Sequence, residues 1–182
     1  SAIEHGTGVR GGKMDQYAIC NGQIGSAMLL DCRTMQHKAI ALPESWQFLL
    51  INTGVKHNLA FTAYNERRAE AESALDQLQK HFPHLKTLRD AEVSQIEQVL
   101  EKGSKAYNRA LHVVSENKRV LAFELSATIG DIRSAGRLLD QSHQSLRDLY
   151  EVSCPELDYL QQLASKSSSI FGSRMMGGGF GG

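Results

Sequence analysis

The sequence has few cysteines, no excess of charge of either sign and no long apolar run. Its three cysteines, Cys20, Cys32 and Cys154, are widely spaced among 182 residues and form no CxxC pair. An odd number of scattered cysteines argues against a disulfide framework and against a zinc site, and it fits a reducing cytosol. We therefore expect a cytosolic protein.

The charges balance, with 20 Lys and Arg against 20 Asp and Glu. This balance gives no reason to expect nucleic acid or an anionic membrane as a partner. No segment approaches the roughly 20 apolar residues that cross a bilayer, and residues 1–16 contain no apolar core of a signal peptide. Hydrophobic residues make up 41% of the chain, enough to bury a core in one large domain or two small ones.

Both ends are unusual for a globular protein. The chain starts at SAIEHGTG without a methionine and stops within a glycine-rich tail, MMGGGFGG. These ends lead us to expect a segment of a longer protein.

Residues 24–52 have the pattern of β-structure. Three short apolar runs, IGSAMLLDCRTM, HKAIAL and WQFLLINT, are separated by turn-like or polar stretches. The FLLIN portion has little alternation, which predicts a third strand buried on both faces.

The pattern changes to helix from about residue 59. The first predicted helix ends at Pro83, and its apolar face consists of Tyr64, Ala71, Leu75, Leu78 and Phe82. A short helix over 91–103 closes at Gly103. A third helix runs to Gly130, and its apolar stripe consists of Tyr107, Ala110, Leu111, Val114 and Leu121.

The remaining elements complete an α+β pattern. Asp131 can cap a helix over about 131–147, and Ser153 and Glu156 have capping-box spacing around Pro155 in a first turn. The SSSIFGSRMM segment reads as a strand leading into the glycines. Strands, then helices, then a strand indicate an α+β chain rather than a βαβ alternation.

The stretch RGGKMDQ, residues 10–16, places a lone carboxylate behind a glycine turn. Asp15 at a helix N-terminus can simply satisfy the helix dipole and the free N–H groups. Alternatively, the glycines let a substrate approach the backbone while Asp15 accepts its proton. The motif by itself leaves both interpretations open.

The tail GGGFGG also has two interpretations. Glycines can turn successive N–H groups toward one anion, or the tail can be a flexible linker. It matches neither the phosphate loop GxxxxGK[ST] nor the dinucleotide motif GxGxxG.

Other polar or aromatic candidates have simpler explanations. His81 and His84 flank Pro83 without a third ligand nearby, and Tyr64 and Tyr107 lie on apolar helix faces where core packing with a satisfied hydroxyl is the default. The segment Ser142–Ser145, which contains His143, has no evident third catalytic group, so we expect a surface or structural role.

Five segments resemble the galactokinase family of the GHMP sugar and metabolite kinases. GVRGGKMDQYAICNG is similar to the signature GV-x-[CS]-GIMDQ, TAYNERRAEAESA to the Y-x-x-RR stretch, and GSRMMGGGFGG to the closing motif GARMTGAGFGG. HVVSENKRVLAF and SHQSLRDLYEVSCPELD are also close to galactokinase segments. All five occur in the family's order and cover nearly the whole chain.

The resemblance implies a role for several residues. Asp15 matches the catalytic base toward the galactose C1 hydroxyl, Gly12 the glycine whose backbone approaches the sugar, and Tyr64 a sugar-contacting tyrosine. The closing motif, beside the nucleotide phosphates, corresponds to Gly177, Gly178, Gly179 and Phe180.

The resemblance also implies a fold and a reaction. Residues 1–55 would end the N-terminal domain of a GHMP kinase, and residues 56–182 would form a helix-rich, ferredoxin-like C-terminal domain. The reaction would transfer the γ-phosphoryl group of ATP, with Mg²⁺, to the C1 hydroxyl of galactose. Positioning and charge stabilisation dominate such a transfer, so one carboxylate is sufficient as base.

Departures from the family pattern limit the prediction. Lys13 stands where the family has Ile, and Gly11 replaces a Cys or Ser. The family's GEHTDY-like and GLSSSAA motifs, the arginine that pairs with the base and a final strand do not occur in the chain. We expect roughly the second half of a kinase, inactive alone. Another sugar kinase (for N-acetylgalactosamine, arabinose or a heptose), a non-catalytic sugar sensor and an inert fragment remain alternatives.

Overall fold

A computed structural model describes residues 12, 14–55 and 60–181. It begins with helix α2 (Met14–Asn21) and strands β1 (Ser26–Asp31) and β2 (Gln36–Ala41). Helices follow from residue 60: α3 (Ala60–Gln79), α4 (Val93–Val99), α5 (Lys105–Thr128), α6 (Ile132–Ser145) and α7 (Pro155–Ser165). A 3-10 turn at Leu88–Asp90 and a π-helical turn at Leu146–Tyr150 complete the order. The predicted α+β class is confirmed.

The first two predicted strands form an antiparallel hairpin. Their register pairs Ser26 with Ala41 and Asp31 with Gln36. The third predicted strand is wrong, because residues 46–55 are irregular and Leu49 and Leu50 are 78% and 75% exposed. A strand needs a neighbour for its N–H and C=O groups, and no further strand lies beside this run in the described residues.

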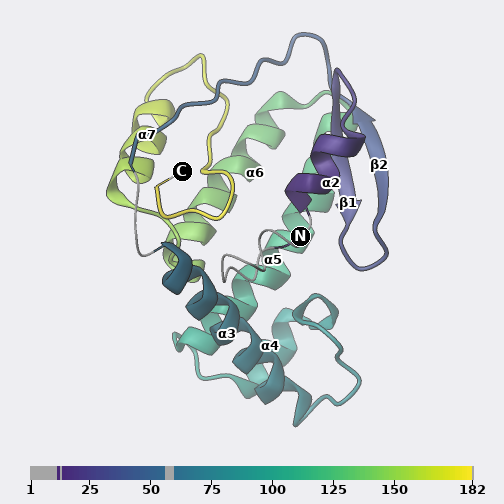
Figure 1. Cartoon of the computed structure of the whole chain (residues 1–182), viewed down its shortest axis with the longest axis vertical. Coiled ribbons are helices and arrows are strands. Elements are labelled where there is room, and N and C mark those ends of the chain that lie inside the picture. Colours follow the sequence, from purple (N-terminus) through teal and green to yellow (C-terminus); the bar gives the residue numbers. More distant parts are fainter. Residues whose placement is uncertain (1–11, 13, 56–59, 182) are drawn as a thin grey trace.

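The main core lies among α3, α4 and α5. Leu78, Ile96 and Ala110 are fully buried there, as the helical periodicity of α3 and α5 predicts for Leu78 and Ala110. The apolar stripe assigned to α5 is wrong at one end, because Leu121 is 60% exposed. The reason is that the partners of this core, α3 and α4, lie along the first half of α5 (Figure 1).

The helix ends differ from the sequence prediction in two places. Asp131 caps α6 as predicted and accepts a hydrogen bond from the Ser134 N–H at 3.0 Å. Gly103, with φ of 83°, lies in the turn after α4 rather than at its C-cap. The capping box at Ser153 is also wrong: Cys154 is the N-cap, Pro155 is the first residue of α7, and Ser153 Oγ instead donates to Asp158.

The strand expected before the glycine tail is an irregular segment. Residues 170–176 have no strand partner in the described part of the chain, and they cross α6 instead. Gly136 and Gly172 meet at this crossing so closely that neither position has room for a Cβ atom. The Ser173 N–H donates to Asp140 Oδ1 at 2.9 Å and fixes the segment on α6.

Helix α5 is the long axis of the arrangement (Figure 1). Helices α3 and α4 lie toward one end of it, and the hairpin lies beside the other end, where Lys38 Nζ and Glu124 Oε1 are 2.7 Å apart. The yellow C-terminal segment lies between α6 and α7 in this view. None of the described helices is both long and apolar enough to cross a membrane.

Candidate functional site

The glycine loop, residues 175–181, is held at both ends. The Met175 N–H donates to His143 Nδ1 at 3.2 Å, and the Phe180 N–H donates to the Val152 carbonyl at 2.8 Å. At Gly179 an added Cβ would collide with Val152, so only glycine fits. Two backbone anchors and this close contact do not fit a flexible linker.

The middle of the glycine loop presents backbone donors. Gly177 and Gly179 have φ of 69° and 84°, whereas Gly178 between them is not in the positive-φ region. Within the described part of the chain, the N–H groups of residues 176–179 donate to no acceptor. Alternating backbone conformations with free N–H groups are the geometry of an anion-binding nest.

Tyr64, near the start of α3, lies against this loop. A Cβ placed on Gly178 would be 3.6 Å from Cδ2 and 3.7 Å from Cε2 of the tyrosine ring. The Tyr64 side chain is half-buried, and its hydroxyl makes no hydrogen bond to a described residue. The structure therefore brings two of the sequence-predicted site residues together and leaves the tyrosine hydroxyl available.

Asp15 lies in the first turn of α2, apart from this pair. It forms no hydrogen bond or ion pair with another described residue, and α2 buries none of its side chains. The Tyr17 hydroxyl, which donates to the Met35 carbonyl at 3.0 Å, attaches α2 to the hairpin. Gly12 has open space around its Cβ position, and Lys13 and Gly11 lie outside the described residues.

A charge cluster around the buried Arg109, which the sequence did not reveal, lies next to the attachment point of the loop. It includes Glu151, which precedes the loop-binding residue Val152. Arg109 of α5 is fully buried, donates from Nε to Glu70 Oε2 at 2.7 Å and from Nη2 to Glu151 Oε2 at 2.7 Å. It also donates to the Leu149 carbonyl. Arg67 adds a second donor to Glu151 Oε2 at 2.9 Å. The cluster joins α3, α5 and the π-helical turn.

These contacts shift the ionisation of both acids. The Arg109 guanidinium, helped by Arg67, holds the pKa of Glu151 below its usual value. For Glu70, burial acts to raise the pKa, but the hydrogen bonds from Arg109 and Lys105 outweigh it, so the net shift is downward. Glu151 itself has a φ of 56°, and the two arginines stabilise this left-handed conformation, which turns the chain toward Val152.

His112 packs on the same turn. Its ring stacks on Tyr150 with 4.5 Å between centroids, and Nδ1 is 2.8 Å from Ser145 Oγ. Burial first, and then the charges of Arg119, Arg174 and Arg109, lower its pKa to about 4. His112 is therefore neutral at pH 7 and serves as a buried packing group.

The Ser142–Ser145 segment is structural. The sequence offered no third group for His143, but the fold supplies Asp158, whose Oδ1 lies 3.2 Å from His143 Nε2. Ser142 does not complete a catalytic triad, because its Oγ donates to Glu116 Oε2 at 2.6 Å. Ser142, His143 and Ser145 are buried and Gln144 is exposed, so a structural role fits the three buried residues and the surface role is wrong for them.

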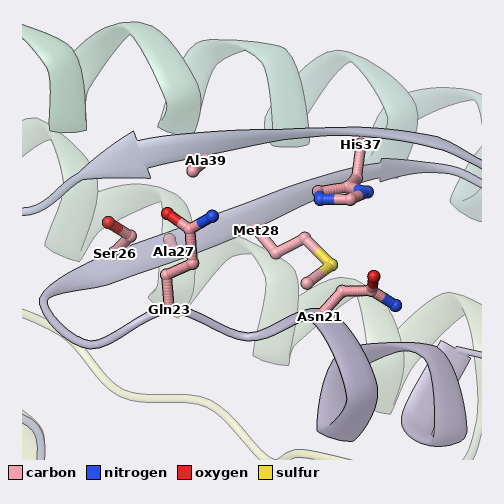
Figure 2. Close-up of a pocket in the computed structure, with 7 residues that line it drawn as sticks. All are labelled: Asn21, Gln23, Ser26, Ala27, Met28, His37 and Ala39. Carbon is pink, nitrogen blue, oxygen red and sulfur yellow. The ribbon is translucent and has the colours of Figure 1, made fainter.

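Hollows in the described surface include one at the hairpin and one at the start of α7. The one in Figure 2 lies between the end of α2 and the hairpin, with Met28 between His37 and Asn21, and its volume of about 10 Å³ is that of a single water position. A second, of about 390 Å³, lies between residues 51–53 and the start of α7. Neither hollow includes Tyr64 or the glycine loop.

A metal centre of the chain's own is not visible in the described ranges. They contain no group of three His, Cys, Asp or Glu side chains that could hold an ion. The arrangement around Tyr64 and the glycine loop can bind by a hydroxyl, an aromatic face and backbone donors. It contains no nucleophile or base of its own.

Comparisons with known proteins find one group of relatives. Residues 121–182 match the family model described as GHMP kinases C terminal. A galactokinase of Roseiflexus sp. (strain RS-1) is 40% identical over 178 residues, 96% of this chain and 45% of that protein. The galactokinase of Homo sapiens is 41% identical over 173 residues, 94% of this chain and 43% of that protein.

A solved structure supports the same relationship. The galactokinase of Lactococcus lactis, complexed with galactose, superposes with a TM-score of 0.88 and 32% identity over 99% of this chain and 47% of that one. The chain thus spans a little under half of the length of the relatives that it matches. Over that span, the chain is similar to galactokinases, members of the GHMP kinases.

Proposed function

We propose that this chain is part of a cytosolic galactokinase, which transfers the γ-phosphoryl group of ATP to the C1 hydroxyl of galactose. The observation that carries the proposal is the closeness of the Tyr64 ring to Gly178, where an added Cβ would touch the ring. These two residues are 114 positions apart, and the family resemblance assigns them to the sugar and to the phosphate neighbourhood. Their meeting is what a site joining a sugar to a phosphate requires.

In this proposal each described residue has one task. The Tyr64 hydroxyl, which hydrogen-bonds to none of the described residues, donates to or accepts from a sugar hydroxyl. The N–H groups of residues 176–179 contribute positive dipole density near the phosphates. As the C1 oxygen bonds to the γ-phosphorus and the bond to the ADP oxygen breaks, the Asp15 carboxylate accepts the C1 hydroxyl proton.

Mg²⁺ would come with its nucleotide. The described residues offer no cluster of three metal ligands, so we assign no metal-binding side chain to them. We propose that the ion enters as Mg·ATP and is held by residues beyond those described. We also propose a domain division near residue 55, which is supported by the irregular run between the hairpin and α3.

The test is a kinase of the relatives' full length that carries these 182 residues, hereafter the full-length kinase. We expect Asp15→Asn to lower kcat for galactose by about 10²–10⁴-fold, the usual contribution of a general base, with ATP affinity nearly unchanged. Asp76→Asn is the matched control, because Asp76 lies exposed on α3, and it should retain wild-type kcat. Near-normal kcat in Asp15→Asn would leave Asp15 as a helix-capping acid.

The same assay separates the sugar alternatives. Galactose, N-acetylgalactosamine, arabinose and a heptose are compared as acceptors at equal concentration, and the proposal expects the highest kcat/KM for galactose. Sugar binding without phosphoryl transfer to any of them would instead indicate a sensor.

A further inference from the structure

His143 connects three separate segments near the glycine loop. It lies on α6 with 1% of its surface exposed. One ring nitrogen, Nε2, is 3.2 Å from Asp158 Oδ1 on α7, and the other, Nδ1, is 3.2 Å from the Met175 backbone nitrogen. No other described side chain hydrogen-bonds to the N–H of Met175, the first residue of the loop.

The hydrogen bonds assign a different task to each ring nitrogen. A backbone N–H can only donate, so Nδ1 must accept from Met175 and carries no proton. The ring proton then sits on Nε2 and is donated to Asp158. Ser153 Oγ donates to the same Asp158 oxygen at 2.6 Å and holds the carboxylate in place. The tautomer of His143 is therefore fixed by its neighbours.

The position of Met175 determines where the loop starts. Its side chain is 4% exposed and packs with Leu146 and Val152, the residue whose carbonyl accepts the Phe180 N–H. Because Gly179 fits against Val152 with no space to spare, a shift at Met175 would be transmitted to residues 176–179.

We infer that His143 is a positioning residue, which holds the glycine loop in its phosphate-facing geometry through Nδ1 and the Met175 N–H. This inference rests on the proposed function. It assigns the Nε2–Asp158 bond a supporting task only, so losing the acceptor at Nδ1 should impair ATP use more than losing the donor at Nε2. A histidine that merely filled the core would show no such asymmetry.

Two substitutions separate the two ring nitrogens. The side-chain oxygen of Asn can occupy the place of Nδ1 and still accept from Met175. The side-chain amide of Gln can occupy the place of Nε2 and still donate to Asp158. In the full-length kinase we expect His143→Gln to lower kcat/KM for ATP by about five- to tenfold, the value of one hydrogen bond. His143→Asn should stay within about twofold of wild type, and KM for galactose should change little in both.

Two measurements do not depend on activity. Hydrogen exchange of the Met175 amide should be faster in His143→Gln than in His143→Asn. In the wild-type protein, the ¹⁵N spectrum of labelled histidine should show His143 protonated at Nε2 alone, which tests the geometry even where a variant does not fold. A proton on Nδ1 would overturn the inference.

The kinetic results distinguish a failure of this inference from a failure of the proposed function. Equal losses in His143→Gln and His143→Asn, in proportion to the fall in Tm, would reduce His143 to a packing residue and overturn the inference alone. The inference would also fail if Met175 exchange differed but ATP kinetics did not. A wild-type kinase that phosphorylates no sugar would overturn the proposed function, and this inference with it.

Discussion

The helical region from α3 onward and the region before residue 56 differ in how far they bury their apolar side chains. Helices α3, α4 and α5 bury a common core in which Ala74, Leu78 and Ile96 have no exposed surface. The earlier region has one hairpin and one short helix, and it leaves Phe48, Leu49 and Leu50 exposed. Helices α3 and α4 and the first half of α5 find apolar partners within this chain, whereas the apolar residues of the earlier region, like Leu121 and Leu125 near the end of α5, find few.

The difference bears on function, because the proposed site takes residues from both regions. Tyr64 and the glycine loop belong to the helical region, where buried side chains hold them. Asp15 belongs to the earlier region, where α2 buries no side chain. We therefore expect the loop and Tyr64 to be placed correctly in this chain and Asp15 to depend on additional structure.

The largest expected effect is a loss of folding stability when the buried arginine of the helical region is removed. We expect Arg109→Ala to lower the free energy of unfolding by about 3–5 kcal/mol, because it removes the fully buried partner of Glu70 and Glu151. The two acids would keep only Arg67 and Lys105, which are less buried.

The matched variant is Arg89→Ala, which removes an exposed pair with Asp31 at the hairpin and should cost far less, because water screens both charges. Urea unfolding compares the two variants. Similar losses in the free energy of unfolding would show that the buried cluster stabilises the fold no more than an exposed ion pair does.

An intermediate effect is expected from pH. The pKa of His112 falls from 6.5 to about 4 in the folded protein, so the unfolded chain binds a proton that the folded chain refuses. The free energy of unfolding should therefore fall as the pH drops from about 6.5 to 4, by at most about 3 kcal/mol.

Urea unfolding at several pH values measures this dependence. His112→Gln should flatten the curve in that window and leave the decline at lower pH, where Glu70 and Glu151 take up protons. An NMR titration of the His112 ring with a midpoint near 6.5 would contradict the account.

The smallest effect concerns Tyr64. We expect Tyr64→Phe in the full-length kinase to raise KM for galactose more than KM for ATP, at a cost of about 0.5–1.5 kcal/mol for one neutral hydrogen bond. Tyr159→Phe on α7 is the control, since Tyr159 is 61% exposed and does not come within 4 Å of the Cβ position of Gly178. Unchanged KM for galactose with a lower Tm would instead support core packing for Tyr64.

The elements that were predicted correctly depend on residues that are close together in the sequence. The hairpin follows from two short apolar runs separated by a turn-like stretch, and the helices follow from a period of 3.6 residues. The Asp131 cap follows from one side chain bonding three residues ahead. The predicted strands at WQFLLINT and SSSIFGSRMM failed because a strand requires a partner, which a local run cannot supply.

The missed site residues depend on distant contacts. Arg109 is 39 positions from Glu70 and 42 from Glu151, and nothing in its immediate neighbours marks it as buried. His143 and Asp158 are separated by the π-helical turn and by Glu151 in a left-handed conformation. The sequence contained the residues, but their pairing follows only from the fold.

The most direct test measures transfer of radiolabelled phosphate from ATP to galactose, with Mg²⁺, by the 182-residue chain and by the full-length kinase. We predict product from the full-length kinase and none above background from the 182-residue chain alone, because we expect most groups that hold sugar and triphosphate to lie outside it. Turnover by the 182-residue chain that disappears with Asp15→Ala would contradict the account, since these residues would then hold a complete site.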